Sequence, residues 1–600
     1  MSPLSRMFAS SSRRLASALS PRRAATTRTP PGARRFLARL FASSSSSSSS
    51  DARVDVDAFL EEFTNHERAG VPKGAATAAD AGAGDAAFDL GRVRRLLATL
   101  GDPQRACPVI HVAGTKGKGS TVAAIAAVLR AAGINTGTYK SPHVHAFSER
   151  IVCGNGDDVH GVPGEEEEEE EEEEKDGGGG GSITIDTATA SAIRAARDAE
   201  RGALTHFEAL TAIALKHFAD RGADCAVVEV GLGGASDATN VFASDDLAAA
   251  AIVAVGGDHV EALGGSARSI VDAKCGIVKA GRPVFIAKQP GGGGVGGEEM
   301  DAMLRERVEE AGGDLVSEDV SGSAGGVRVS VAFKRVVERE KARRFEQIVD
   351  VTIHSAARSA RTLKDVALGT VGPHQRDNLV VATRVLEFLR LGGGGVARRL
   401  RRGALAPTPW GAITDDALRL GLSRWRSPGC FEMITPSPPK GAKTCIADDE
   451  EGAFYEDLPN PPVVADGAHT PESAAALFAT VEEAFPGKAI VAVVAMADDK
   501  DHEGFFQEIV RVVDQTKLRA VFLSSVPIAG GGARATATAT LRAAWEKNIR
   551  PDVAAIAERG VLSEAMDAAS DLARECDAVV VVTGSLNVVA RARRWGDARR

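Results

Sequence analysis

The segment from His111 to Thr121 reads His-Val-Ala-Gly-Thr-Lys-Gly-Lys-Gly-Ser-Thr, and it constrains the fold more than any other part of the chain. It follows an apolar run typical of a buried strand and precedes a run of small and apolar residues, Val122 to Ala132, that predicts a helix. Glycines at such a junction let backbone N–H groups surround phosphates at a helix N-terminus, and Lys118 adds a mobile positive charge. The segment therefore predicts a strand, a phosphate-binding loop and a helix, with ATP as the ligand.

The loop departs from the common Walker A spacing. Val112 stands where the first glycine of that pattern would be, and Gly119 separates Lys118 from Ser120. A glycine turn that merely closes a strand-helix unit is the alternative interpretation, and the paired lysines favour phosphate binding over it.

Six hundred residues, 44% of them apolar, are enough for at least two hydrophobic cores. Short Val, Ile and Ala runs, such as 226–230, 249–255 and 283–287, alternate with helical patterns such as 207–218. This alternation predicts an α/β fold with a mainly parallel sheet covered by helices on both faces.

A second strand-helix series follows a polar, proline-containing stretch at about 406–428, with buried strands expected at 462–465, 489–494, 520–524 and 578–583. We expect an ATP-binding domain over 52–425 and a smaller C-terminal α/β domain over 426–600, with a cleft between them as the site. Glu-rich and Gly-rich inserts near 157–182 and 290–298 cannot bury apolar surface and are expected to be disordered loops.

The first 50 residues contain nine Arg, no Lys, no acidic residue and a closing run of eight Ser from Ser43 to Ser50. This composition is typical of an organelle transit peptide. A disordered basic tail is the alternative. Because the arginines are spread among apolar residues, we expect import into the mitochondrial matrix, with the plastid stroma as the second choice.

Without those nine arginines the formal net charge of −9 becomes −18, and ten of these charges lie in the run Glu165–Glu174. A remaining body near −8 gives no support to nucleic-acid binding. No apolar stretch is long enough for a membrane span, so a soluble protein is expected. The seven cysteines show no Cys-x-x-Cys pairing, which favours unpaired thiols in a reducing compartment.

The sequence Gly-Thr-Lys-Gly-Lys-Gly-Ser resembles the nucleotide loop of the Mur ligase superfamily, specifically of its branch of dihydrofolate and folylpolyglutamate synthases. The resemblance extends from about Asp85 to Arg591. It implies a Mur-ligase-like P-loop ATPase domain with a smaller Rossmann-like C-terminal domain. The residues that the resemblance assigns to ATP binding in the loop are Gly114, Thr115, Lys116, Gly117, Lys118, Gly119 and Ser120.

The resemblance also implies a site for two Mg²⁺ ions. Ser141 and Glu229 would help to hold one ion, and His259 with Glu229 the second. Lys274 matches the lysine that carries a carbamate in this family and so becomes an anionic oxygen ligand. Taken singly, each residue has an ordinary structural interpretation; together with Lys118, the residues Glu229, His259 and Lys274 form the predicted catalytic set.

Asn378 and Asp466 match family positions that contact the nucleotide from the two domains. One departure concerns Pro428-Gly-Cys430-Phe-Glu432, because the family has Pro-Gly-Arg there and its arginine is expected to meet an ATP phosphate. Arg424 and Arg426 are the nearby candidates to replace it.

Three further motifs resemble the pterin site of members that accept dihydropteroate. The predicted substrate residues are Asp89, Leu90 and Gly91, then Thr205, His206, Phe207 and Glu208, and finally Asp237 and Ala238. Phe207 could stack on a pterin ring, although a place in a helix core is an equal interpretation of that residue alone.

The resemblance therefore implies an ATP-dependent ligase that joins L-glutamate to 7,8-dihydropteroate through an acyl phosphate, with a monomer expected. A folylpolyglutamate synthase that extends reduced folates such as tetrahydrofolate, or a bifunctional enzyme, is the nearest alternative. A nucleotide-binding homologue with impaired catalysis is the second alternative, and only Cys430 supports it.

Overall fold

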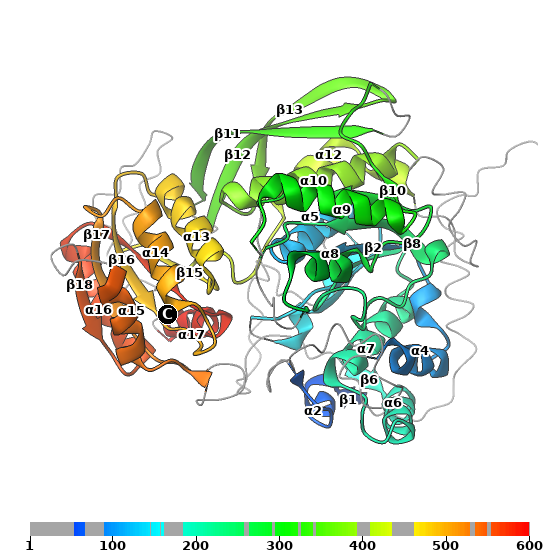
Figure 1. Ribbon diagram of the computed structural model, residues 1–600, viewed down its shortest axis with the longest axis horizontal. Helices are drawn as coiled ribbons and strands as arrows, with labels where there is room; N and C mark the ends of the chain where they lie inside the picture. The colour runs from blue at the N-terminus through cyan, green and yellow to red at the C-terminus, as the bar shows by residue number, and fades with distance from the viewer. Residues whose placement is uncertain are drawn as a thin grey trace, which may run out of the picture. The chain divides into compact units, whose positions relative to one another are not determined.

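A computed structural model gives the fold (Figure 1). It describes residues 53–66, 89–144, 146–155, 158–160, 184–256, 263–290, 294–321, 326–339, 344–392, 409–434, 461–527, 534–548 and 554–598. The predicted transit peptide, almost all of the predicted 157–182 insert, part of the 290–298 insert and His259 lie outside these ranges.

The first large sheet has eight strands in the order β10-β9-β8-β2-β7-β3-β4-β5. These are β10 (Asp314–Leu315), β9 (Pro283–Ile286), β8 (Leu247–Ile252), β2 (Val109–Ala113), β7 (Cys225–Glu229), β3 (Thr136–Tyr139), β4 (Ile151–Asn155) and β5 (Asp158–His160). The pairs from β10 to β3 are parallel, and β4 and β5 continue the sheet antiparallel. The predicted parallel α/β architecture is therefore present.

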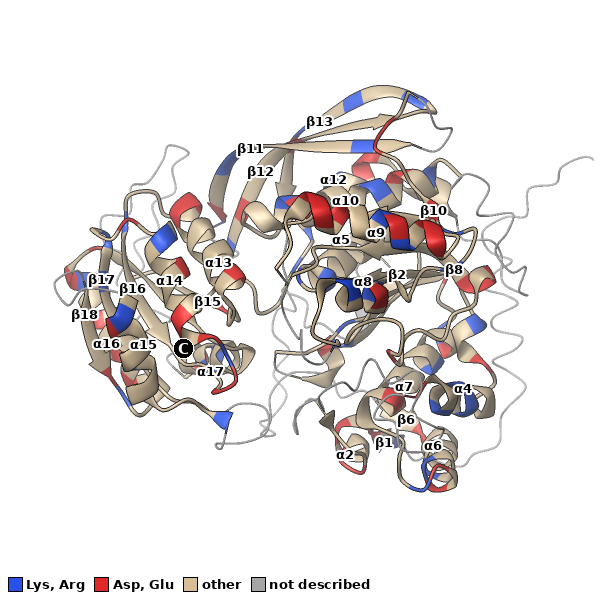
Figure 2. Ribbon diagram, viewed as in Figure 1, with Lys and Arg blue, Asp and Glu red and all other residues tan. Residues whose placement is uncertain are grey.

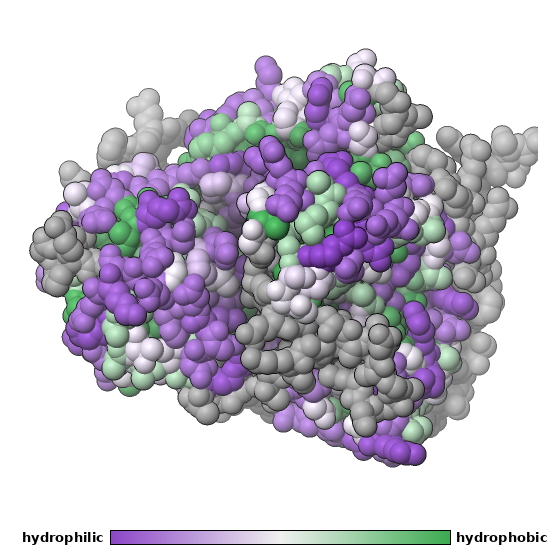
Figure 3. Space-filling view, viewed as in Figure 1, coloured by the Kyte–Doolittle hydropathy of each residue, from purple (hydrophilic) through white to green (hydrophobic). Residues whose placement is uncertain are grey.

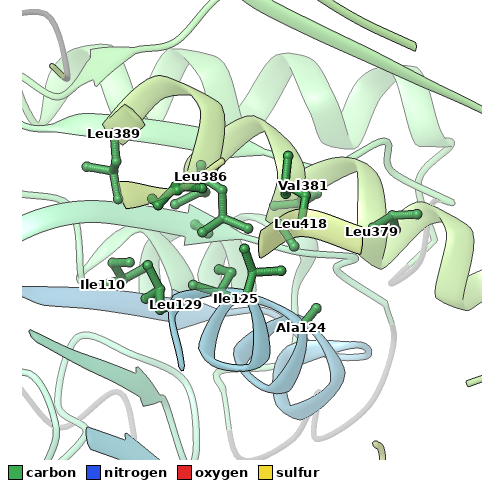
Figure 4. Close-up of a cluster of buried hydrophobic side chains, with 14 of the residues drawn as sticks. Ile110, Ala124, Ile125, Leu129, Leu379, Val381, Leu386, Leu389 and Leu418 are labelled. Atoms are coloured by element: carbon green, nitrogen blue, oxygen red, sulfur yellow. The ribbon is translucent and has the colours of Figure 1, made fainter. Parts of the chain in front are cut away.

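Alternate residues of the central strands enter different cores, so both sheet faces are covered. Ile110 and Val112 of β2 pack with α5 (Lys118–Ala131), α10 (Pro373–Arg390) and α12 (Asp415–Ser423). Figure 4 shows Ile125 and Leu129 of α5 on the side of that helix facing Leu386 of α10. A strand buried on both faces must be apolar throughout, which explains the continuous apolar runs in the sequence.

The opposite face of the sheet carries two further cores. One contains residues of α2 (Val56–Leu60), α4 (Leu90–Thr99), α6 (Thr187–Ala199) and α7 (His206–Asp220), and the other contains residues of α8 (Ala267–Cys275) and α9 (Gly297–Glu310). A two-stranded sheet of β1 (Arg53–Asp55) and β6 (Thr184–Asp186) lies beside α2 and α6. The short 3₁₀ helices are η1 (Pro103–Arg105), η2 (Phe147–Glu149), η3 (Ser244–Asp246) and η5 (Trp410–Ala412).

A three-stranded antiparallel sheet was not anticipated from the sequence. It consists of β11 (Val327–Arg339), β12 (Arg344–Ser355) and β13 (Arg358–Leu368), paired in chain order. Its buried residues join the core of α10, and Arg384 of α10 donates hydrogen bonds to the carbonyls of Val327, Ile286 and Val316 at 3.1, 3.0 and 2.8 Å. The buried guanidinium of α10 thus forms hydrogen bonds with both the three-stranded sheet and the edge of the first large sheet.

The second large sheet has the order β14-β15-β19-β16-β17-β18 and is parallel except at β14. Its strands are β14 (Glu432–Met433), β15 (Val463–Asp466), β16 (Ala489–Val494), β17 (Leu518–Leu523), β18 (Ala555–Glu558) and β19 (Ala578–Thr583). One core contains residues of α13 (Pro471–Ala484), α14 (His502–Val512) and α15 (Thr538–Asn548), and the other those of α16 (Leu562–Glu575) and α17 (Leu586–Asp597).

Several predicted boundaries need correction. Helix α5 begins at Lys118, four residues before the predicted start at Val122. The loop ends at Gly117, whose positive φ (84°) lets the helix begin at the next residue. The insert expected at 290–298 ends earlier, since α9 begins at Gly297. The proline-containing stretch 406–428 contains α12, and Trp410 and Trp425 are buried there against the first core.

The outer helices are strongly charged, and Figure 2 shows residues of both signs along α9. The face seen in Figure 3 is largely hydrophilic, with apolar residues in separate groups. None of the helices in the described part of the chain is long and apolar enough to cross a membrane.

Close packing between α12 and α5 depends on Gly421. A Cβ atom at this position would lie 2.4 Å from the Val128 Cα atom, so the helices must separate to admit it. We expect Gly421→Ala to lower the free energy of unfolding by about 1–3 kcal/mol. Gly411→Ala is the matched control, because nothing lies within 4 Å of its Cβ position. Equal urea midpoints for the two variants would contradict this account of the packing.

Candidate active site

The phosphate loop leaves the carboxyl end of β2 and is anchored on the neighbouring strand end. The N–H groups of Thr115 and Lys116 donate to the carbonyl of Ala254, at 2.8 and 3.1 Å. Gly117 is the N-cap of α5, and its φ of 84° favours glycine because L side chains are strained there. The first N–H groups of a helix have no partner within the helix, so this end of α5 is suited to an anion.

Two side chains from distant segments contact Ser120 in the first turn of α5. Gln375 Nε2 donates to Ser120 Oγ at 3.3 Å, and Ser427 Oγ donates to the same oxygen at 3.2 Å. Asn378 donates to Gln375 Oε1 at 3.1 Å, and its Oδ1 lies 2.2 Å from the position of a Cβ atom on Gly117. The structure therefore places predicted Asn378 against the phosphate loop. Sequence reasoning missed Gln375 and Ser427, although both stand beside motifs it used.

Glu229 lies beside the start of the same helix. Its Oε2 accepts a hydrogen bond from the N–H of Ser141 at 3.1 Å and lies 3.2 Å from the Cβ position of Gly119. Burial raises the pKa of Glu229, and the charge of Lys118 and the Ser141 N–H oppose this shift. A buried carboxylate that faces both a lysine and a phosphate loop is suited to bind a cation when the carboxylate is deprotonated.

The predicted metal ligands are only partly assembled in the described residues. Ser141 and Glu229 come together and supply the oxygen donors that Mg²⁺ prefers. Lys274 is 4% exposed in the last turn of α8, beside Ala273, whose carbonyl accepts from the Ala235 N–H at 2.8 Å. Among the described residues, no three His, Cys, Asp or Glu side chains form a metal-binding group.

The predicted substrate residue Glu208 has a role in local structure. Thr205 and Glu208 form a capping box at the start of α7, and Glu208 Oε2 accepts from the Thr205 N–H at 2.7 Å. Its other oxygen forms a buried ion pair with Arg92 of α4, at 3.0 Å. Burial raises the pKa of Glu208, whereas Arg92 lowers it. On α4 itself, Asp89 is the N-cap and accepts from the Gly91 N–H at 2.7 Å.

Asp237 organises the loop that follows β7. Its Oδ2 accepts from the N–H of Leu232 at 2.8 Å, and its Oδ1 accepts from the hydroxyl of Thr239 at 2.5 Å. Thr239 Oγ1 also lies 2.9 Å from His111 Nε2. Burial lowers the pKa of His111 to about 3, so this imidazole of β2 is neutral at physiological pH. Ala238, next to Asp237, is buried in the α7 core.

Phe207 contacts two residues that are close in sequence to the predicted metal ligands. Its ring stacks on Tyr139 with centroids 5.9 Å apart and an interplanar angle of 30°, and its Cζ is 2.5 Å from the Cβ position of Gly231. Tyr139 is two residues before Ser141, and Gly231 is two residues after Glu229. Leu90 packs at the margin of the same core, and buried His206 lies with its ring centroid 5.4 Å from that of Phe147.

Asp466 lies at the carboxyl end of β15. Its carboxylate accepts from the N–H groups of Phe431 and Ala468, both at 2.8 Å, and burial raises its pKa to about 7. Gly467 N–H donates to the Gly429 carbonyl at 2.8 Å. These bonds join the predicted nucleotide residue Asp466 to the segment that carries exposed Cys430.

Neither arginine offered as a replacement at position 430 is shown at the phosphate loop. Arg426 Nη1 donates to the carbonyls of Ser423 and Trp425, at 2.8 and 3.0 Å, and so caps α12. Arg424 is the exposed C-cap residue of the same helix.

Replacement of Gly117 tests the phosphate loop. An alanine there would be strained by the positive φ and would collide with Asn378, so we expect Gly117→Ala to weaken Mg-ATP binding by about tenfold or more. Gly133→Ala is the control, because its φ is similarly positive (75°) at the other end of α5 but nothing lies within 4 Å. Equilibrium nucleotide binding is the measurement, and equal losses in both variants would contradict the prediction.

Comparisons with known proteins identify related sequences and a matching domain family. Residues 454–586 match the family described as Mur ligase, glutamate ligase domain. The chain is 27% identical to dihydrofolate synthase/folylpolyglutamate synthase of Bacillus subtilis over 422 residues, covering 70% of this chain and 78% of the relative. It is 28% identical to the protein of that name from Mycobacterium tuberculosis over 516 residues, covering 84% and 89%.

Solved structures share the fold. Folylpolyglutamate synthase of Mycobacterium tuberculosis complexed with ADP and AMPPCP has a TM-score of 0.59 at 24% identity, covering 85% of this chain and 95% of that one. A bifunctional folylpolyglutamate synthase/dihydrofolate synthase with Mn, AMPPNP and L-glutamate bound has a TM-score of 0.54 at 23% identity, covering 84% and 94%. The chain therefore carries the glutamate ligase domain of Mur ligases over residues 454–586, and over most of its length it is similar to the ATP-dependent ligases named dihydrofolate synthase/folylpolyglutamate synthase.

Proposed function

We propose that this protein joins L-glutamate to 7,8-dihydropteroate, with ATP as the energy source, and releases 7,8-dihydrofolate, ADP and phosphate. The observation that carries the proposal is the position of Phe207. This ring lies against Tyr139 and Gly231, each two residues from a predicted metal ligand, so a flat pterin bound there would have its carboxylate arm near the phosphate loop.

The proposed reaction has two steps, formation of an acyl phosphate and its reaction with the glutamate amine. The dihydropteroate carboxylate attacks the γ-phosphorus of ATP, the bond from that phosphorus to the bridging oxygen breaks, and ADP leaves. The glutamate amine then attacks the acyl carbon, loses a proton, and phosphate departs. Lys118 and the N–H groups at the start of α5 stabilise the negative charge on the phosphoryl oxygens.

Divalent metal belongs to the same proposal. Ser141 and Glu229 would hold Mg²⁺, which would screen the triphosphate charge, and His259 and a carbamylated Lys274 would complete the proposed pair of metal sites. No side chain acts as a covalent nucleophile. Positioning of the acceptor and donor supplies the remaining rate enhancement.

Folylpolyglutamate synthesis is the second candidate function. The relatives from Bacillus subtilis and Mycobacterium tuberculosis carry both activities in their names, and the relative from Lacticaseibacillus casei, 25% identical over 511 residues, is named folylpolyglutamate synthase. The local roles of Glu208 and Asp89 in capping helices are compatible with either acceptor.

Substrate-dependent ADP release separates these candidates. With Mg-ATP and L-glutamate, we expect turnover with 7,8-dihydropteroate and none with tetrahydrofolate. Lys118→Ala should abolish turnover, because the amine at the head of the phosphate loop is lost. Turnover with tetrahydrofolate alone would contradict the proposal in favour of a polyglutamylating enzyme, and turnover with both would indicate a bifunctional one. Nucleotide binding without turnover would favour the impaired homologue.

We also propose import into the mitochondrial matrix, with the plastid stroma as the alternative. The support is the arginine-rich, acid-free composition of residues 1–50. A fluorescent protein fused after residue 50 is expected to enter mitochondria, and a fusion in which the nine arginines are replaced by glutamine is expected to stay in the cytosol. Plastid fluorescence would support the alternative, and cytosolic fluorescence of the unaltered fusion would contradict both.

A further inference from the structure

Lys140 lies at the crowded carboxyl edge of the first sheet. Tyr139, the last residue of β3, pairs with Val228 of β7, so Lys140 comes level with Glu229. On its other side β7 pairs with β2, where Val112 lies opposite Glu229 and the phosphate loop begins two residues later. The strand order therefore places Lys140, Glu229 and the phosphate loop on three adjacent strand ends.

The segment with Cys430 approaches the same edge. Ser427 donates to Ser120 of α5, and the Cβ position of Gly429 lies 3.0 Å from Val144 Cγ2, four residues beyond Lys140. Position 430 thus lies close to both the phosphate-loop helix and the end of β3. Cys430 and Lys140 are also near enough to influence each other electrostatically.

Lys140 makes no ion pair with any residue that the structure describes. The side chain is half-buried, and among the residues that the structure describes no carboxylate forms an ion pair with its ammonium group. Burial lowers the pKa of Lys140, while the more distant charges of Glu229 and Glu149 raise it. Lys118, in contrast, already donates to the Thr115 carbonyl at 3.3 Å. A half-buried cation without a direct counterion, at the edge of a phosphate-binding loop, is suited to an anionic ligand.

We propose that Lys140 contacts the terminal phosphate of bound ATP and supplies there the positive charge that position 430, a cysteine, lacks. The inference rests on the proposed function in that ATP is the phosphoryl donor. As the bond to ADP breaks, charge spreads over the non-bridging oxygens of the transferred group, and a nearby ammonium stabilises that charge. A lysine provides a point charge without the two-pronged geometry of arginine, so the two residues can supply the same charge from different positions.

Charge replacement tests the inference. We expect Lys140→Ala to weaken binding of a non-hydrolysable ATP analogue on the order of tenfold to a hundredfold, and binding of ADP much less, since only the former carries the terminal phosphate. Adding Cys430→Arg to Lys140→Ala should restore most of the lost affinity and turnover. Lys216→Ala is the matched control, because this lysine of α7 is paired with Asp220 at 2.5 Å. Its nucleotide affinity should not change.

Three results would overturn the inference: equal losses of ATP-analogue and ADP affinity, unchanged affinity with a lower melting temperature, or no recovery in the double variant. Each would mean that Lys140 only balances the charges of Glu229 and Glu149. If Lys140→Ala does not fold, Lys140→Met retains the aliphatic stem and serves in its place. Binding is measured without acceptor or glutamate, so selective loss of ATP affinity in a chain inactive on both folates would support the inference while contradicting the proposed function.

Discussion

The site depends on the parallel pairing of β2 with β7 on one side and β8 on the other. Because helices cover both faces of this sheet, these strands are apolar almost throughout apart from His111 within β2, and the charged residue Glu229 lies at the carboxyl end of β7. The chain leads from β2 to β3, beyond β7, and from β7 to β8, on the opposite side of β2, and connections that run in opposite directions open a crevice at the strand ends. The phosphate loop, Glu229 and Ser141 meet there for that reason.

Much of this arrangement was predictable because it follows from local patterns. The strands at 489–494 and 578–583 agree with β16 and β19 in both bounds, since buried parallel strands are continuous apolar runs with polar ends. The phosphate loop was predictable because its glycines are required by backbone conformation. The fold class and the resemblance to dihydrofolate and folylpolyglutamate synthases were therefore accessible from the sequence, and both are confirmed.

Other features depend on contacts between distant segments. Gln375 and Ser427 reach Ser120 from positions 255 and 307 residues away, and no local pattern marks such a contact. Strands β11 to β13 were not predicted although Val327, Val329 and Val331 alternate with polar residues, a period-two signal of a strand that directly follows a glycine-rich segment. Thr205 with Glu208 is a capping-box spacing, so its structural role was readable in the sequence beside the functional one.

Helix α10 contacts both the phosphate loop and helix α13. Within one turn it presents Asn378 to the phosphate loop and Arg376 to Glu483 of α13, the latter through two hydrogen bonds of 2.9 Å. Arg376 also lies over the ring of Phe333 in β11, 4.6 Å from its centroid. An α-helix is stiff over such a length, so a displacement of α13 would also displace Asn378. A shift of the second large sheet that carries α13 along would therefore be expected to change the position of Asn378 at the phosphate loop as well.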